Sequence, residues 1–330
     1  MVSNANSARG HSLLMAFAFI FPGQGSQHVG MGRELADAFA AARDVFTEVD
    51  DALSRHLSAL MWEGPEADLQ LTENTQPALM TVSLAAMRVL EREAGVAVTR
   101  ARFVAGHSLG EYSALAAAGA LGLAETARLL RRRGRAMQEA VPVGAGAMSA
   151  LIGVDIDIAR DLARRASEAC GGAVCAPAND NAPGQVVISG AREAVAKAIE
   201  LAPEAGVRRA ILLPVSAPFH CALMEPAARV MREALGATAL RPPAVAMVSN
   251  VTAVPVLEPA EIAELLVEQV TAMVRWRECV LAMAGAGIDS VYEIGAGKVL
   301  CGLARRASPG LRTMSVGAPR DIEALAAALG

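Results

Sequence analysis

Aromatic residues are scarce in this chain, and neither sign of charge is in large excess. Phenylalanine, tryptophan and tyrosine make up 3% of the 330 residues, and the formal net charge at pH 7 is −4. Surfaces that bind nucleic acid are generally basic and stack bases on aromatic side chains. The sequence therefore predicts no nucleic-acid partner, and any site for an anionic partner has to be local.

Cysteine pairs and long apolar runs are also missing. The five cysteines form no Cys-x-x-Cys motif, which favours reduced thiols in a cytoplasmic protein over disulfides or a zinc site. No apolar run approaches the roughly 18 residues that cross a bilayer, so no membrane association is expected. We do not expect the apolar run 12–21 to be a signal peptide, because its Ala16-Phe17-Ala18 lies inside the run rather than after it. We interpret residues 1–14 as a disordered extension.

The chain is longer than one hydrophobic core usually supports, and its pattern changes partway along. Residues 144–213 are patterned as strand, helix, strand, strand, helix and strand, the order of a ferredoxin-like βαββαβ unit. The flanking segments, 15–143 and 214–330, alternate apolar strands with helices, which is typical of a parallel sheet. We expect a large α/β-hydrolase-like domain with a small ferredoxin-like domain inserted into it. Strands of the large domain are expected at 17–21, 103–105, 244–249, 290–294 and 313–316.

A Gly-x-Ser-x-Gly motif stands between an apolar strand and an alanine-rich helix. Gly106-His107-Ser108-Leu109-Gly110 follows the apolar residues 103–105. In a nucleophile elbow, the glycines allow a strained turn that exposes the serine beside a helix N-terminus. The motif predicts that Ser108 is a nucleophile; the alternative is a glycine-rich helix start that binds nothing.

A nucleophilic serine needs a base and an oxyanion hole. His220 is the only histidine in the C-terminal half, and the alternative is a structural histidine. His28 is the other contender, since His107 adjoins the serine and should point away from it. The glycine loop 22–27 lacks the Lys-Ser/Thr ending of a P-loop, and either cradles a phosphate or supplies oxyanion-hole N–H groups.

One arginine lies on the apolar face of its helix. In the helix expected at 124–140, Arg133 falls between Leu129, Leu130 and Met137. The other arginines form a stripe on the opposite, solvated face: Arg128, Arg131, Arg132 and Arg135. Because a buried arginine needs an anion, its partner is either a structural carboxylate or the carboxylate of a substrate.

A series of motifs extends from Met15 to the end of the chain. These are Pro22-Gly23-Gln24-Gly25-Ser26-Gln27, Gly106 through Tyr112, Arg133-Gly134 with Met137-Gln138-Glu139, Asn179 with Pro183-Gly184-Gln185-Val186-Val187, His220 with Leu223-Met224, Gln269 with Val274-Arg275-Trp276, and Glu293 through Leu300. In this order they resemble the malonyl-CoA:acyl-carrier-protein transacylase family, the acyltransferases of fatty acid synthesis.

The resemblance implies a catalytic Ser–His pair without a triad aspartate. Ser108 would take the malonyl group from malonyl-CoA, and His220 would act as base before the phosphopantetheine thiol of acyl carrier protein accepts it. The further residues implied are Gln24 and Leu109 in the oxyanion hole, Arg133 on the malonyl carboxylate, and Gln269 and Asn179 as supporting residues. No metal and no permanent cofactor are implied, and we expect a monomer.

Three further features bear on specificity and partners. Phe219 precedes His220, at a position where some members of the family have serine. In related polyketide acyltransferases, a phenylalanine at this position accompanies a preference for malonyl over methylmalonyl groups. Met273 occupies a position where members of the family frequently have proline. This difference removes no functional atom. Lys298, Arg305 and Arg306 resemble a docking region for the acidic carrier protein; the alternative is a solvated helix end.

Several alternatives stay open at this level. The same chemistry serves fatty acid synthesis, polyketide assembly and malonate decarboxylation. A serine esterase or thioesterase would need an acid, for which Asp155, Asp157, Asp161 and Asp180 are available. A catalytically silent module that only binds carrier protein is the remaining alternative.

Overall fold

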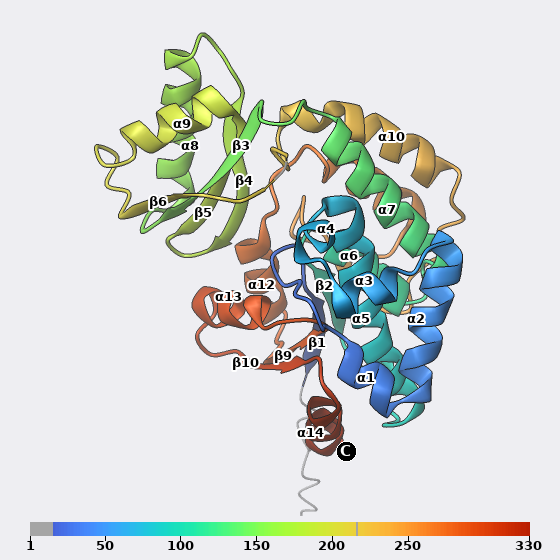
Figure 1. The fold of residues 1–330 in the computed structure, drawn as a ribbon. Coiled ribbons are helices and arrows are strands. Elements are labelled where there is room, and N and C mark those ends of the chain that lie inside the picture. The colour runs from blue at the N-terminus through green and yellow to red at the C-terminus, as the bar shows by residue number, and fades with distance from the viewer. Residues whose placement is uncertain (1–15, 216) are drawn as a thin grey trace, which may run out of the picture.

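The computed structural model describes residues 16–215 and 217–330, and the extension expected at 1–14 lies outside them. A six-stranded sheet forms its centre, in the order β10-β9-β1-β2-β7-β8 (Figure 1). Its strands are β1 (Phe17–Phe21), β2 (Phe103–Gly106), β7 (Met247–Val248), β8 (Pro255–Val256), β9 (Ser290–Ile294) and β10 (Arg312–Val316). Neighbouring strands are parallel except β7 and β8.

The edge of this sheet differs from the sequence prediction. The strand expected at 244–249 contains only the two residues of β7, and the antiparallel β8 was not predicted. The chain reverses between them in the loop 249–254, where the Ser249 N–H donates to the Val254 oxygen and the Ser249 oxygen accepts the Ala253 N–H. The sheet is therefore mixed rather than purely parallel.

Helices cover both faces of the six-stranded sheet (Figure 1). They are α1 (Arg33–Ala38), α2 (Ala40–Leu53), α3 (Leu57–Glu63), α4 (Glu66–Leu69), α5 (Thr72–Arg92), α6 (Gly110–Ala117), α7 (Leu123–Glu139), α10 (Glu225–Gly236), α11 (Pro259–Glu268), α12 (Trp276–Gly285), α13 (Val299–Ala307) and α14 (Pro319–Leu329), with short 3₁₀ turns at Val98–Arg100 and Ala222–Met224. No helix in the described ranges is long and apolar enough to cross a membrane.

Strand β1 is apolar at every position because it is buried on both faces. Phe17, Phe19 and Phe21 point into the core that includes α5 and α7, whereas Ala18 and Ile20 point into a second core with α12 and α13. Successive side chains of a strand alternate between faces, so a strand covered on both sides is apolar at every position.

A second, antiparallel sheet is formed by residues 146–212. It comprises β3 (Gly146–Ile152), β4 (Cys175–Ala182), β5 (Gln185–Ala191) and β6 (Arg209–Leu212), in the order β4-β5-β3-β6. Helices α8 (Ile156–Ala169) and α9 (Arg192–Leu201) pack on it around a separate apolar cluster. The elements follow one another along the chain in the order expected for 144–213.

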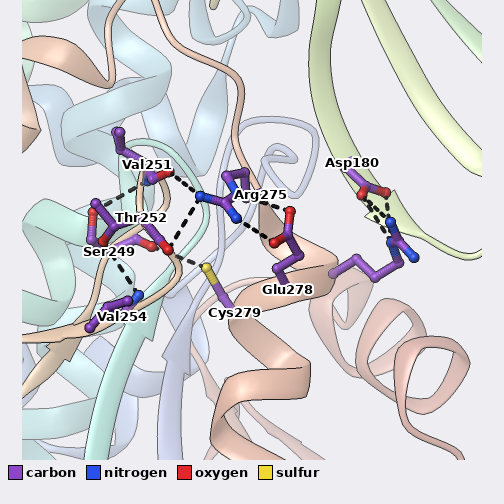
Figure 2. A network of polar contacts seen from close by, with 9 residues as sticks. Asp180, Ser249, Val251, Thr252, Val254, Arg275, Glu278 and Cys279 are labelled. Carbon is purple, nitrogen blue, oxygen red and sulfur yellow. Dashed lines mark hydrogen bonds and ion pairs between the residues drawn. The ribbon is translucent and has the colours of Figure 1, made fainter. Parts of the chain in front are cut away.

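The two sheets are joined next to the sequence motifs. Asn179 of β4 forms a parallel bridge with Val274, whose carbonyl accepts the Asp180 N–H. The buried Asp180 carboxylate, labelled at the right of Figure 2, also pairs with Arg277 of α12 at 2.8 Å. These contacts fix the smaller sheet over one end of the larger one.

Candidate active site

The elbow sequence makes a sharp turn between β2 and α6. Ser108 adopts a φ of 54°, in the left-handed region that non-glycine residues rarely occupy. A Cβ on Gly106 would lie 1.9 Å from the Gly110 carbonyl carbon, and one on Gly110 would lie 2.3 Å from the Phe21 oxygen. Both glycines are therefore required for strand, helix and loop to meet this closely.

Ser108 and His220 lie in direct contact. The serine Oγ is 2.8 Å from His220 Nε2, and His220 Nδ1 is 2.8 Å from the backbone oxygen of Gln269. Because a carbonyl only accepts, Nδ1 carries the ring proton and Nε2 is free to accept the hydroxyl proton. Burial, helped by the charge of Arg133, lowers the pKa of His220 to about 3. The ring is therefore a neutral base at physiological pH.

The other candidate bases and acids lie elsewhere. His107 Nε2 is 2.9 Å from Asn181 Oδ1, and His28 lies 3.4 Å from the Ser26 oxygen, neither beside the Ser108 hydroxyl. The aspartates available for a triad pair with arginines instead: Asp157 with Arg160, Asp161 with Arg164 and Asp180 with Arg277, while Asp155 precedes α8. Within the described ranges, no carboxylate contacts His220.

Two backbone N–H groups beside the serine are unpaired. Neither Leu109 N–H nor Gln24 N–H has a hydrogen-bond acceptor in the described part of the chain, and both residues line the cavity at Ser108. Leu109 stands at the N-terminus of α6, and the Gln24 side chain is fixed by a 2.9 Å hydrogen bond from Thr72 Oγ1. Unpaired N–H groups at a helix N-terminus can stabilise an oxyanion.

Arg133 is buried next to the serine and forms no salt bridge. It is 1% exposed; one guanidinium nitrogen donates to Gln76 Oε1 at 2.8 Å, and the other to Gln269 Oε1 at 2.8 Å and to Ser108 Oγ at 3.2 Å. No carboxylate among the described residues lies within 4 Å of it. Burial lowers the pKa of its guanidinium, which Tyr112 and Glu111 oppose. Among the described residues, the structural carboxylate considered from the sequence does not lie within that distance, and the oxygens that accept hydrogen bonds from Arg133 are neutral.

These groups line one cavity of about 720 Å³ between the two sheets. The larger sheet and its helices contribute Ser108, Arg133 and His220, and the smaller sheet contributes Met148 and Asn179. Phe219, 8% exposed, forms part of the wall. The volume is typical of a small-molecule site.

The basic residues considered for docking lie outside this cavity. Lys298, Arg305 and Arg306 are exposed, at the start and in the last turn of α13. Arg306 donates to the Pro183 oxygen at 2.9 Å, which ties α13 to the smaller sheet. Gly297 packs against Ser26 of the glycine loop, so the beginning of α13 adjoins the cavity rim.

Sequence reasoning missed two residues that hold the elbow, Asn250 and Glu111. Asn250 Oδ1 accepts the Ser108 N–H at 2.7 Å, and its Nδ2 donates to the Gly106 oxygen at 2.8 Å. Glu111 is fully buried and accepts from the Asn250 N–H and from Gln269 Nε2. Glu111 could have been found from the sequence, because a carboxylate is unusual in an otherwise apolar helix start. Asn250 could not, because an asparagine in a loop is ordinary.

The loop that carries Asn250 is itself fixed, as Figure 2 shows. Arg275 donates from its guanidinium to the oxygens of Val251 and Thr252 and pairs with Glu278. Cys279 Sγ lies 3.3 Å from the Ser249 oxygen. Helix α12 thereby holds the loop 249–254 against the elbow.

Comparison with known proteins identifies the family. Residues 18–312 match the acyl transferase domain family. A malonyl CoA-acyl carrier protein transacylase of Bacillus subtilis is 45% identical over 306 residues, covering 93% of this chain and 95% of the relative. The chain belongs to the malonyl-CoA:acyl carrier protein transacylase family. It is an acyltransferase, and the resemblance seen in its motifs is confirmed.

Solved transacylase structures share the whole fold. An acyl-carrier-protein S-malonyltransferase of Bartonella henselae superposes with a TM-score of 0.93 at 52% identity, covering 96% of this chain and all of that one. A malonyl-transacylase solved with a type II PKS acyl-carrier protein gives 0.91 at 40% identity, covering 95% of this chain and 99% of that one. Among the described residues, no cluster of His, Cys, Asp and Glu could hold a metal ion.

The neutral state of His220 gives a pH prediction. Because its pKa is lowered to about 3, the fraction of unprotonated base stays close to one as the pH falls from 7.5 to 5.5. The rate at which a fluorophosphonate probe labels Ser108 should change by less than about twofold over this range. A histidine with an ordinary pKa would reduce it about tenfold. A labelling rate that falls with a midpoint near pH 6.5 would contradict the assignment of His220 as a base with a lowered pKa. The Ser108→Ala variant controls for labelling at other residues.

Proposed function

We propose that this protein transfers the malonyl group from malonyl-CoA to the phosphopantetheine thiol of acyl carrier protein through a malonyl-Ser108 intermediate. The observation that carries the proposal is the buried Arg133, whose guanidinium lies 3.2 Å from the Ser108 hydroxyl and has no carboxylate within 4 Å among the described residues. A malonyl group on the Ser108 oxygen would place its free carboxylate within reach of the Arg133 guanidinium.

The mechanism follows from the Ser–His geometry. His220 Nε2 removes the Ser108 proton as Oγ attacks the thioester carbon, and the oxyanion of the tetrahedral intermediate accepts hydrogen bonds from the N–H groups of Leu109 and Gln24. The carbon–sulfur bond then breaks, and the proton on His220 passes to the departing thiol of coenzyme A. The carrier thiol enters by the reverse sequence and leaves with the malonyl group, which is a ping-pong cycle.

Selectivity in this proposal comes from Arg133 and the cavity wall. An acetyl group would leave the guanidinium buried and unpaired, which costs about 2–5 kcal/mol, or roughly 30- to several-thousand-fold in discrimination. The Phe219 side chain narrows the cavity and disfavours a branched acyl group. Gln269 supports both parts, through its backbone oxygen on His220 and its side chain on Arg133, and Asn179 supports the cavity wall.

The finer description of the molecule belongs to the same proposal. We assign 15–143 and 214–330 to an α/β-hydrolase-like domain and 144–213 to an inserted ferredoxin-like domain, supported by the strand order β4-β5-β3-β6. We propose a cytoplasmic monomer without a permanent cofactor that supplies fatty acid synthesis. Polyketide assembly is the second candidate, because one 40% identical neighbour was solved with a type II PKS carrier.

Incubation with malonyl-CoA and holo acyl carrier protein tests the reaction. We expect intact-mass spectrometry to show a malonyl adduct on the wild type without carrier, and malonyl-carrier once carrier is added. Ser108→Ala should give neither species. Free malonate without malonyl-carrier would identify a hydrolase, and absence of any adduct or product would identify a silent binding module.

Carrier docking is a separate part of the proposal. Carrier proteins are acidic, and Lys298, Arg305 and Arg306 are exposed along α13, whose beginning adjoins the cavity rim. Charge reversal of Arg305 and Arg306 should raise KM for the carrier about tenfold and leave malonylation of Ser108 by malonyl-CoA unchanged. The matched control reverses Arg229 and Arg232, which are exposed on α10. Equal effects of both double variants, or an equal loss in both half-reactions, would rule the patch out.

A further inference from the structure

Glu111 is a buried carboxyl group that the proposed mechanism does not use. It is fully buried in the first turn of α6, three residues after the nucleophile, and no basic side chain in the described ranges lies within 4 Å of it. One oxygen accepts the Asn250 N–H at 2.5 Å and the other accepts Gln269 Nε2 at 2.5 Å. Both neighbours are donors, so both oxygens have to act as acceptors.

This pair of acceptors fixes which way the Gln269 amide points. Its Nε2 donates to Glu111 and to the Ser108 oxygen at 2.9 Å, so its Oε1 faces Arg133 at 2.8 Å. Reversal of the amide would place its NH₂ group against the guanidinium, where two donors meet. Glu111 and the Ser108 oxygen together therefore orient the amide so that Arg133 is held by an acceptor.

We propose that Glu111 is a positioning residue for the acyl carboxylate: it holds the Gln269 amide so that Oε1 faces Arg133, which keeps the guanidinium in place for a malonyl carboxylate on Ser108. The inference rests on the proposed malonyl transfer. Glu111 takes no part in the making or breaking of bonds.

Substitution of Glu111 by glutamine tests the positioning role. The new amide offers one acceptor to two donors, so it no longer holds the Gln269 NH₂ group away from Arg133. In Glu111→Gln, kcat/KM for malonyl-CoA should fall about tenfold or more, mainly through KM. Acetylation of Ser108 by acetyl-CoA, followed by intact mass, should fall by a clearly smaller factor, so that the malonyl-to-acetyl ratio drops.

The matched control is Glu293→Gln. Glu293 is equally buried and also accepts two N–H groups, from Leu300 and Cys301, but it lies outside the cavity lining. It should lower thermal stability and leave the malonyl-to-acetyl ratio unchanged. An equal loss of both acyl transfers in Glu111→Gln would overturn the positioning role.

The result for the wild type separates this inference from the proposed function. If the wild type forms no malonyl adduct by mass, the proposed function fails. If the wild type forms the adduct and Glu111→Gln keeps the wild-type malonyl-to-acetyl ratio, only the positioning role fails.

Discussion

The site depends on one constraint, the burial of a guanidinium without a carboxylate. Arg133 is 1% exposed, and among the described residues it donates hydrogen bonds to the oxygens of Gln76, Gln269 and Ser108, all neutral. A buried cation of this kind costs free energy that neutral acceptors only partly offset. An acyl group bearing a carboxylate removes the cost, which is why an ordinary serine nucleophile becomes selective in the proposed function.

The fold brings distant segments together to meet this constraint. The elbow, α7 and the loops after β7 and α11 all converge on the end of the larger sheet, and the smaller sheet closes the cavity. Ser108 and His220 both adopt positive φ angles, of 54° and 59°. Such strain persists only where the surroundings fix it, and here Asn250, Gln269 and Glu111 hold the backbone from several sides.

Much of this arrangement was predictable because its signals are local in the sequence. Strand β1 and the split order of the smaller sheet were readable from periodicity and glycine positions, and Arg133 stood out by lying on an apolar helix face. The family is confirmed, whereas the roles of its site residues remain predictions. The two-residue β7, the antiparallel β8 and Asn250 were not predictable, because their geometry comes from Arg275 and α12, contacts distant in sequence. Gln269 was expected from the family resemblance alone, since a lone glutamine carries no signal of its own.

The most direct measurement of the central claim is the ratio of kcat/KM for malonyl-CoA to that for acetyl-CoA in the wild type and in Arg133→Ala. If the unpaired guanidinium recognises the acyl carboxylate, the ratio should fall by roughly 30-fold or more, with the acetyl reaction retained or increased. A variant that folds, acylates Ser108 and keeps the wild-type ratio would contradict the account.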